Sequence, residues 1–271
     1  MAPARHRLDE DEFMDEQVAK VQRMVLGEPP DLNPSSAARW KACATAYAND
    51  GCVRRYLRTR NWVASRAALS IEKTIKWRLD HGLDQGLGSN AFLAIPAAPT
   101  GEGEGIGKGK ERESTPGMRL SPGRDLLGRP VLVMTVRGMA WADPAGWMKD
   151  LINALEQASR SLSATSSDSW LWLVDLSGCS LLDVPPPSAL ERLTQTLRDH
   201  YPGRLEQAVL IDPPGFFWLA YAFVEKLLDP GTRAKVVLVD RSKGDMGRFI
   251  SEDQLEEAFG GRIRVGPGAR Q

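Results

Sequence analysis

The sequence predicts an α/β protein in which an N-terminal helical unit, residues 1–87, precedes a domain built on a mostly parallel sheet, residues 124–271. In the first part, apolar residues recur at helical spacing without strand alternation. In the second, short apolar runs alternate with segments long enough to be crossover helices. Residues 88–123, between them, have the composition of a flexible linker or loop.

The helical unit is predicted from one apolar stripe and one cap. The stripe has spacings of three and four residues, which place its members on one face of a helix. Its members are Ala64, Ala68, Ile71, Ile75 and Leu79. Asn33 and Ser35 flank Pro34 as candidate caps of an earlier helix that runs toward Tyr47.

The linker is expected to be mobile from Thr100 to Gly123. It contains the run Gly-Glu-Gly-Glu-Gly-Ile-Gly-Lys-Gly-Lys and further charged and proline residues. Such a composition buries too little apolar area to offset the entropy lost on ordering.

The parallel sheet is predicted from four apolar runs, each followed or preceded by a helical segment. The runs are residues 131–136, 170–175, 208–212 and 235–240. The helical segments are residues 144–162, 188–200 and 216–228. Parallel strands need such crossovers, and the crossovers are right-handed in nearly all known cases.

The last helical segment would be apolar and aromatic on nearly every face. It carries five aromatic residues between 216 and 223. Leaving them in water would cost on the order of 10 kcal/mol, so the segment needs a core or a lipid around it. The uncharged run is shorter than the roughly twenty residues that span a bilayer.

Composition excludes several classes of protein. With 42% hydrophobic and 26% charged residues the chain is that of a globular protein, and 35 basic residues balance 35 acidic ones. The chain therefore lacks the overall positive charge that draws proteins to nucleic acid. Three irregularly spaced cysteines, Cys43, Cys52 and Cys179, favour buried thiols in a reducing compartment. With no signal-like N-terminus, we expect a cytoplasmic protein.

No catalytic motif is found. The sequence has no Gly-x-Gly-x-x-Gly, no P-loop and no Gly-x-Ser-x-Gly nucleophile elbow. His6, His81 and His200 have no metal-ligand spacing, and we interpret His200 as structural. We expect no enzyme, no catalytic residue, no metal and no cofactor.

Seven short motifs, in order, resemble the CRAL-TRIO family of lipid-binding and lipid-transfer proteins, which includes phosphatidylinositol-transfer proteins. They are YLRTRNW at 56–62, KWR at 76–78, GRPV at 128–131, DLSG at 175–178, HYPGR at 200–204, LDPGTRAK at 228–235 and FGG at 259–261. The resemblance covers most of the chain. It implies a hydrophobic lipid pocket with the sheet as its floor and a mobile gate helix as its lid.

The resemblance also implies the roles of individual residues. The gate and pocket residues would be Phe216, Phe217, Trp218, Tyr221, Phe223 and Leu227. When the gate is open, its aromatics could enter a membrane surface. Family members that bind phosphatidylinositol hold the headgroup at positions that carry Arg60, Thr232 and Lys235 here. Two cations and a hydroxyl suit a phosphodiester anion.

Two departures from the family pattern leave the ligand open. Gly203 replaces a glutamate of the phosphatidylinositol signature. Leu132, Trp170 and Leu197 stand where family members contact phosphatidylcholine through tyrosines and serines, so choline exchange is not supported. These apolar replacements would suit a sterol or another neutral lipid.

The resemblance therefore gives a first hypothesis and two alternatives. The first is a carrier of a phosphatidylinositol-like phospholipid, cytoplasmic and transiently associated with membranes. The second is a carrier of a sterol or other neutral lipid in the same pocket. The third, from another class, is a protein-interaction module with a vestigial pocket, and any protein partner stays open.

Overall fold

The computed structural model describes residues 2–27, 33–86, 117–162, 167–243 and 245–265. The chain divides into two compact units. One contains Met1–Pro96 with Leu197–Gly203, and the other contains Ala97–Thr196 with Arg204–Gln271. The short segment Leu197–Gly203 thus belongs to the helical unit, although its sequence lies within the predicted sheet domain.

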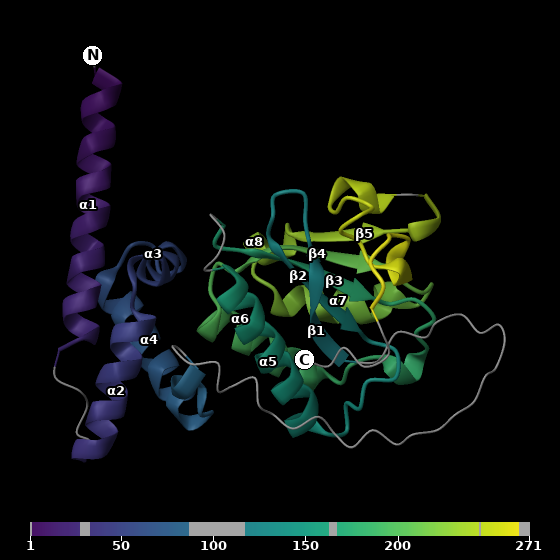
Figure 1. Cartoon of the computed structure of the whole chain (residues 1–271), viewed down its shortest axis with the longest axis horizontal. Helices are drawn as coiled ribbons and strands as arrows, with labels where there is room; N and C mark the ends of the chain where they lie inside the picture. Colours follow the sequence, from purple (N-terminus) through teal and green to yellow (C-terminus); the bar gives the residue numbers. More distant parts are fainter. Residues whose placement is uncertain (1, 28–32, 87–116, 163–166, 244, 266–271) are drawn as a thin grey trace. The chain divides into compact units, whose positions relative to one another are not determined.

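In the helical unit, the described residues up to Gly86 form four α-helices and one short 3-10 turn (Figure 1). They are α1 (Ala2–Val25), α2 (Pro34–Tyr47), α3 (Asp50–Thr59), α4 (Ala64–Asp80) and η1 (Leu83–Gly86). Helix α1 packs on α3 and α4, and α2 packs on α4. The predicted cap of α2 is confirmed, because the Asn33 side chain accepts a hydrogen bond from the Ser36 backbone N–H at 2.9 Å.

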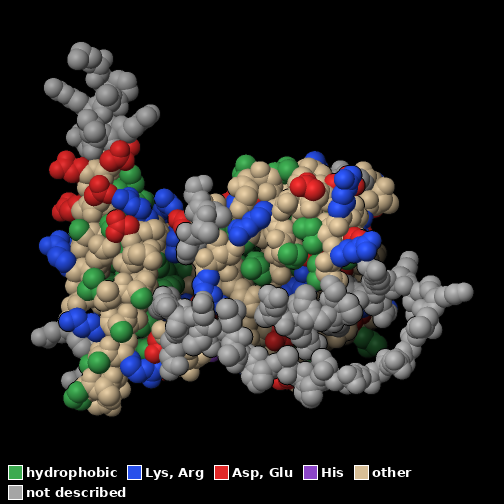
Figure 2. All heavy atoms as spheres, in the orientation of Figure 1, with side chains coloured by type: hydrophobic (Ala, Val, Ile, Leu, Met, Phe, Trp, Pro, Cys, Tyr) green, Lys and Arg blue, Asp and Glu red, His purple; other side chains and the backbone are tan. Residues whose placement is uncertain are grey.

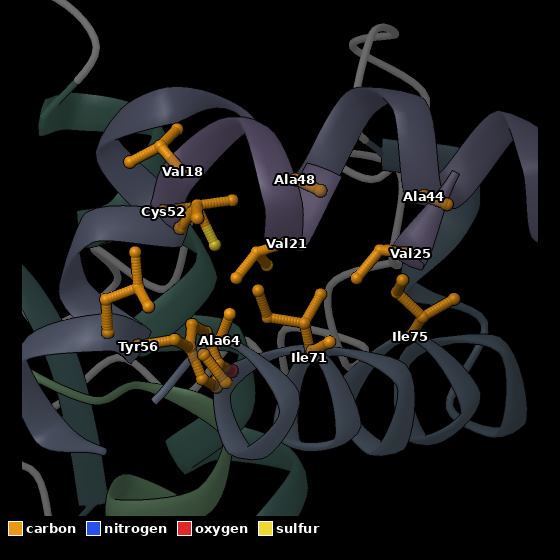
Figure 3. Close-up of a cluster of buried hydrophobic side chains, with 14 of the residues drawn as sticks. Val18, Val21, Val25, Ala44, Ala48, Cys52, Tyr56, Ala64, Ile71 and Ile75 are labelled. Atoms are coloured by element: carbon orange, nitrogen blue, oxygen red, sulfur yellow. The ribbon is translucent and has the colours of Figure 1, made fainter. Parts of the chain in front are cut away.

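The core of this unit forms along one side of α1 and the inner face of α4 (Figure 3). Val18, Val21 and Val25 recur along α1 and are buried. The predicted stripe of α4 faces them, with four buried members and a partly buried Leu79. Residues 10–16 of α1 carry exposed acidic side chains (Figure 2).

The second unit is built on a five-stranded sheet of order β1-β2-β3-β4-β5. Its strands are β1 (Gly117–Arg124), β2 (Pro130–Thr135), β3 (Trp170–Asp175), β4 (Leu205–Ile211) and β5 (Val236–Val239). β1 is antiparallel to β2, and the other three pairs are parallel. The predicted α/β class with a mostly parallel sheet is confirmed.

Strand β1 differs from the prediction, which placed residues 117–123 in the linker. Met118 and Leu120 pair with Met134 and Leu132 of β2, and helix α5 packs on β1. This pairing outweighs the weak strand propensity of the segment's glycines, proline and serine. The remainder of the predicted linker, residues 88–116, lies outside the described residues.

The crossover segments form the helices α5 (Pro144–Leu162), α6 (Pro187–His200) and α7 (Phe217–Leu227), close to the predicted bounds. The shorter helical turns are η3 (Leu181–Asp183), α8 (Pro230–Arg233), η4 (Arg241–Lys243), η5 (Asp245–Arg248) and η6 (Glu257–Phe259). The three crossovers move along the sheet in one direction. Right-handed crossovers therefore place α5, α6 and α7 on the same face.

The opposite face is covered by the C-terminal segment. Odd-numbered residues of β2 to β5, such as Val133, Leu173 and Val209, form one buried cluster with Met246, Ile250, Leu255 and Phe259. Since neighbouring side chains on a strand alternate, the even-numbered residues face the helices.

Candidate functional site

The sheet face formed by the even-numbered residues, called the even face, is apolar, and its residues are buried to different degrees. Register aligns Leu132, Trp172, Ala208 and Val236 across four strands, and Met134, Val174, Leu210 and Leu238 one step further along. The residues of β2 are buried, whereas both residues of β5 are only half-buried. The face thus has a tightly packed end and an apolar end that is still reached by solvent.

Helix α7 forms the crossover at that half-buried end, because it joins β4 to β5. Phe217 is buried and its ring stacks on Tyr221 at a centroid distance of 5.2 Å. Trp218 and Leu219 are exposed, so the helix is apolar on both its inner and its outer face. Phe216 is the half-buried N-cap. The side chains of the predicted gate residues Phe223 and Leu227 lie outside the described set.

The segment before α7 is held in place at Asp212. Asp212 has a φ of 48°, which is unusual for a residue other than glycine. Its backbone N–H donates to the Val239 carbonyl at 2.9 Å, and its carboxylate accepts from Arg241 Nε at 2.5 Å and from the Arg241 backbone N–H. Pro213 and Pro214 follow with restricted φ angles, so the chain is anchored and stiff up to Gly215, just before the helix.

The far end of α7 leads into the Asp-Pro motif that carries the predicted headgroup residues. Asp229 caps α8 by accepting the Thr232 backbone N–H at 3.0 Å. The Thr232 hydroxyl donates to the same carboxylate at 2.6 Å, and this bond lowers the pKa of Asp229. The hydroxyl hydrogen of Thr232 is therefore engaged within the motif.

Lys235 lies beside Thr232, to whose carbonyl its backbone N–H donates at 3.0 Å. Its ammonium Nζ donates to the Leu205 carbonyl at 2.6 Å. An ammonium has three N–H donors, so this bond leaves two for a ligand. The structure thus brings two of the three predicted headgroup residues together, at the start of β5.

The third predicted headgroup residue, Arg60, lies in the helical unit at the C-terminal cap of α3. Its Nε donates to Ser70 Oγ at 2.9 Å, and one terminal nitrogen donates to the Thr59 carbonyl at 3.3 Å. The side chain is half-buried, and Asn61 and Trp62 after it both have positive φ. These contacts fix its guanidinium at the turn between α3 and α4.

The motif at 200–204 is split between the two units. In the helical unit, His200 Nδ1 is 3.0 Å from Thr74 Oγ1, and its ring stacks on Trp77 at 4.1 Å. Burial lowers the pKa of His200 to about 4, which supports its structural interpretation. Gly203 has a φ of 71°. A glutamate there would adopt a strained backbone, which gives a local reason for the glycine.

Two polar groups of the sheet unit were missed by the sequence reasoning. The indole Nε1 atoms of Trp147 in α5 and Trp172 in β3 are buried and find no hydrogen-bond acceptor within the described ranges. Trp172 lies on the even face. Buried indole N–H groups usually have a partner, so an acceptor oxygen of a ligand would suit this site.

The cysteine prediction is correct for two of the three residues. Cys43 and Cys52 are buried, while Cys179 is only partly buried. Among the residues that the structure describes, no group of His, Cys, Asp and Glu could hold a metal ion. Over the same residues, no helix has the length and apolar character needed to cross a bilayer.

The fold and site define a class of α/β protein with an apolar sheet face beneath an aromatic crossover helix. Residues 115–261 match the family model described as CRAL/TRIO domain, which is more than half of the chain. The chain belongs to the CRAL/TRIO domain family, as its motifs predicted.

Curated relatives are similar to the chain in sequence, and one solved structure shares its fold. The chain is 25% identical over 217 residues to the phosphatidylinositol transfer protein PDR17 of Saccharomyces cerevisiae, covering 78% of this chain and 57% of that protein. It is 26% identical over 217 residues to the phosphatidylinositol transfer protein CSR1 of Eremothecium gossypii, covering 79% and 47%. The chain thus spans about half the length of these two relatives. The crystal structure of Sfh5 matches with a TM-score of 0.62 at 13% identity, over 97% of this chain and 90% of that one.

Proposed function

We propose that this protein carries one phosphatidylinositol-like phospholipid between membranes without covalent chemistry, and needs no cofactor or metal. The half-buried even face beneath α7 carries this proposal. Acyl chains laid against Leu210, Val236 and Leu238 would remove apolar surface from water, at roughly 25 cal/mol per Å². The relatives named as phosphatidylinositol transfer proteins support the choice of ligand.

Lys235 and Thr232 of the sheet unit would bind the headgroup, and the family resemblance adds Arg60. Lys235 keeps two N–H donors for a phosphate while holding the Leu205 carbonyl. Thr232 offers its hydroxyl oxygen as it stands, and it would have to turn away from Asp229 to donate to a phosphate. Within the helical unit, the Arg60 Nε donates to Ser70 Oγ. Lys235 is therefore the central phosphate-binding residue of the proposal.

A sterol or other neutral lipid is the second candidate, favoured by two observations. Gly203 removes the family glutamate of the phosphatidylinositol signature, and the Thr232 hydroxyl is already engaged by Asp229. A neutral lipid would use the apolar face alone, with the Trp172 indole N–H as a donor to its single hydroxyl. The protein-interaction module remains the alternative outcome if no lipid binds.

The proposed partners are the lipid and transient membrane surfaces, with no nucleic acid, in the cytoplasm. A vesicle-to-vesicle transfer assay with labelled phosphatidylinositol and labelled sterol tests the proposal. We expect Leu210→Gln, beneath α7, to reduce transfer of the preferred lipid by placing an amide among its acyl chains. Leu127→Gln, exposed in the β1–β2 hairpin, is the matched control. Equal transfer by both variants would contradict the proposal.

A further inference from the structure

A pair of leucines stands in solvent on the loop after β3. Leu181 is 70% exposed and Leu182 is 93% exposed, at the single turn η3. Scattered exposed leucines are ordinary on protein surfaces. An adjacent pair at the tip of one turn is a more specific arrangement, because it presents two large apolar side chains together.

The turn is built to hold this pair in place. The Asp183 carboxylate accepts hydrogen bonds from the Ser180 backbone N–H at 2.8 Å, the Ser180 hydroxyl at 2.7 Å and the Gly138 backbone N–H at 2.7 Å. The Trp141 indole N–H donates to the Asp183 carbonyl at 3.0 Å. Three prolines at 185–187 follow the turn. The leucines therefore project from a firmly anchored loop.

The start of α7 adds two exposed apolar side chains at the same edge of the sheet. β3 and β4 are parallel neighbours, so their carboxyl ends lie side by side, and the Leu176 backbone N–H donates to the Ile211 carbonyl at 3.0 Å. The loop after β3 carries the leucine pair. The loop after β4 leads to Trp218, 61% exposed, and Leu219, 81% exposed.

The backbone of the leucine turn is suited to an apolar surrounding. Four of the five N–H groups from Ser180 to Val184 donate within the turn, namely those of Ser180, Leu182, Asp183 and Val184. A protein partner can supply hydrogen bonds to a docked loop, but hydrocarbon cannot, so a loop that enters lipid must satisfy its own polar groups. Trp218 suits the interface between headgroups and hydrocarbon, where tryptophan is enriched.

Charges at this edge are mixed. Arg137 and Lys243 are exposed on the loops after β2 and β5, Asp143 and Asp240 lie on the same loops, and Asp183 lies in the leucine turn itself. Such an edge has no dominant positive field to attract anionic lipid. Attachment there would depend on apolar insertion and would change little with salt.

We propose that Leu181 and Leu182 form a fixed membrane anchor that inserts into the bilayer surface together with Trp218 and Leu219 of α7. The anchor would hold the carboxyl edge of the sheet against the membrane, so that the lipid carried beneath α7 is exchanged there. This inference rests on the proposed function, since a carrier must meet the membrane that supplies or receives its lipid.

Flotation of the full chain with neutral phosphatidylcholine vesicles tests the anchor. We expect the wild type to bind and the double variant L181S/L182S to bind at least about tenfold more weakly. The chain offers a matched control in L126S/L127S, another exposed leucine pair, 55% and 73% exposed. That pair lies before β2, at the opposite edge of the sheet, and its loss should leave vesicle binding unchanged.

The outcomes separate this inference from the proposed function. Binding of a water-soluble short-chain phosphatidylinositol reports on the lipid site and should be the same in L181S/L182S and wild type. Failure of the wild type to bind vesicles, equal vesicle binding by wild type and L181S/L182S, or equal losses in the two double variants would each overturn the anchor. The single variant L182S, at a nearly fully exposed site, repeats the test without a folding cost.

Discussion

Replacing Lys235 by alanine is the sharpest test of the proposed phosphate contact. The variant loses a charge-assisted hydrogen bond to the headgroup, a contact that contributes about 1.5 to 3 kcal/mol. Because 1.4 kcal/mol corresponds to tenfold in affinity, phosphatidylinositol binding should weaken about 10- to 150-fold. Sterol binding should not change, since a sterol has no phosphate.

The same substitution also has a structural cost. Lys235 Nζ donates to the Leu205 carbonyl at 2.6 Å, so Lys235→Ala should lower the free energy of unfolding by about 1 kcal/mol. Denaturant unfolding measures this loss separately from binding. The control is Lys149→Ala, which removes an exposed charge from α5.

Equilibrium competition against a fluorescent phosphatidylinositol analogue gives the affinities. If Lys235→Ala binds phosphatidylinositol within about twofold of wild type, Lys235 makes no phosphate contact and serves only to hold Leu205.

Three further predictions concern single side chains. Because burial lowers the pKa of His200 from 6.5 to about 4, the unfolded chain binds a proton in this interval that the folded chain does not. This contribution to the free energy of unfolding is complete above pH 6.5 and should decline by about 1 to 2 kcal/mol toward pH 4. Denaturant unfolding at several pH values should show a weaker decline for His200→Gln than for wild type. An equal dependence on pH would refute the lowered pKa of His200. Asp229→Ala removes the cap of α8 and should lower its local stability by about 0.5 to 2 kcal/mol, measured by amide exchange at residues 231–235. Unchanged exchange would contradict the capping role. Trp172→Phe deletes a buried N–H without an acceptor in the described residues. The smaller ring costs packing, which relief of the unpaired N–H offsets in part, so lipid-free stability should fall by no more than about 2 kcal/mol. Lipid affinity should fall as well, and unchanged affinity would show that this N–H donates to no ligand.

The sequence predicted the sheet and its crossovers well because buried parallel strands have continuous apolar runs. β3 has the predicted bounds, Trp170–Asp175, and so does α5, Pro144–Leu162. β1 could not be predicted, since Gly117–Arg124 has neither an apolar run nor clear alternation. Its stability comes from pairing with β2 and packing of α5, which are long-range contacts.

The candidate site was predicted only in part. Motifs located Lys235, Thr232 and Arg60, but not the internal hydrogen bonds that each of them makes. Those bonds depend on where Leu205, Asp229 and Ser70 lie after folding. The indole N–H of Trp172, which finds no acceptor in the described residues, could not be predicted either, because a tryptophan in an apolar run resembles any other core residue.

The exposure of Leu181 and Leu182 could not be predicted from the sequence either. Two leucines in a sequence usually indicate burial, yet the capped turn around Asp183 projects both into solvent. Only the hydrogen bonds from Ser180 and Gly138 explain why the turn holds them there.

Mass spectrometry of the lipid that copurifies with the protein tests the central claim most directly. The full chain is incubated with mixed liposomes of phosphatidylinositol, phosphatidylcholine and sterol, and is then separated from them and extracted. We expect one phosphatidylinositol enriched over its share in the liposomes. Enriched sterol would contradict the phosphate site of Lys235, and a protein without lipid would contradict the carrier itself.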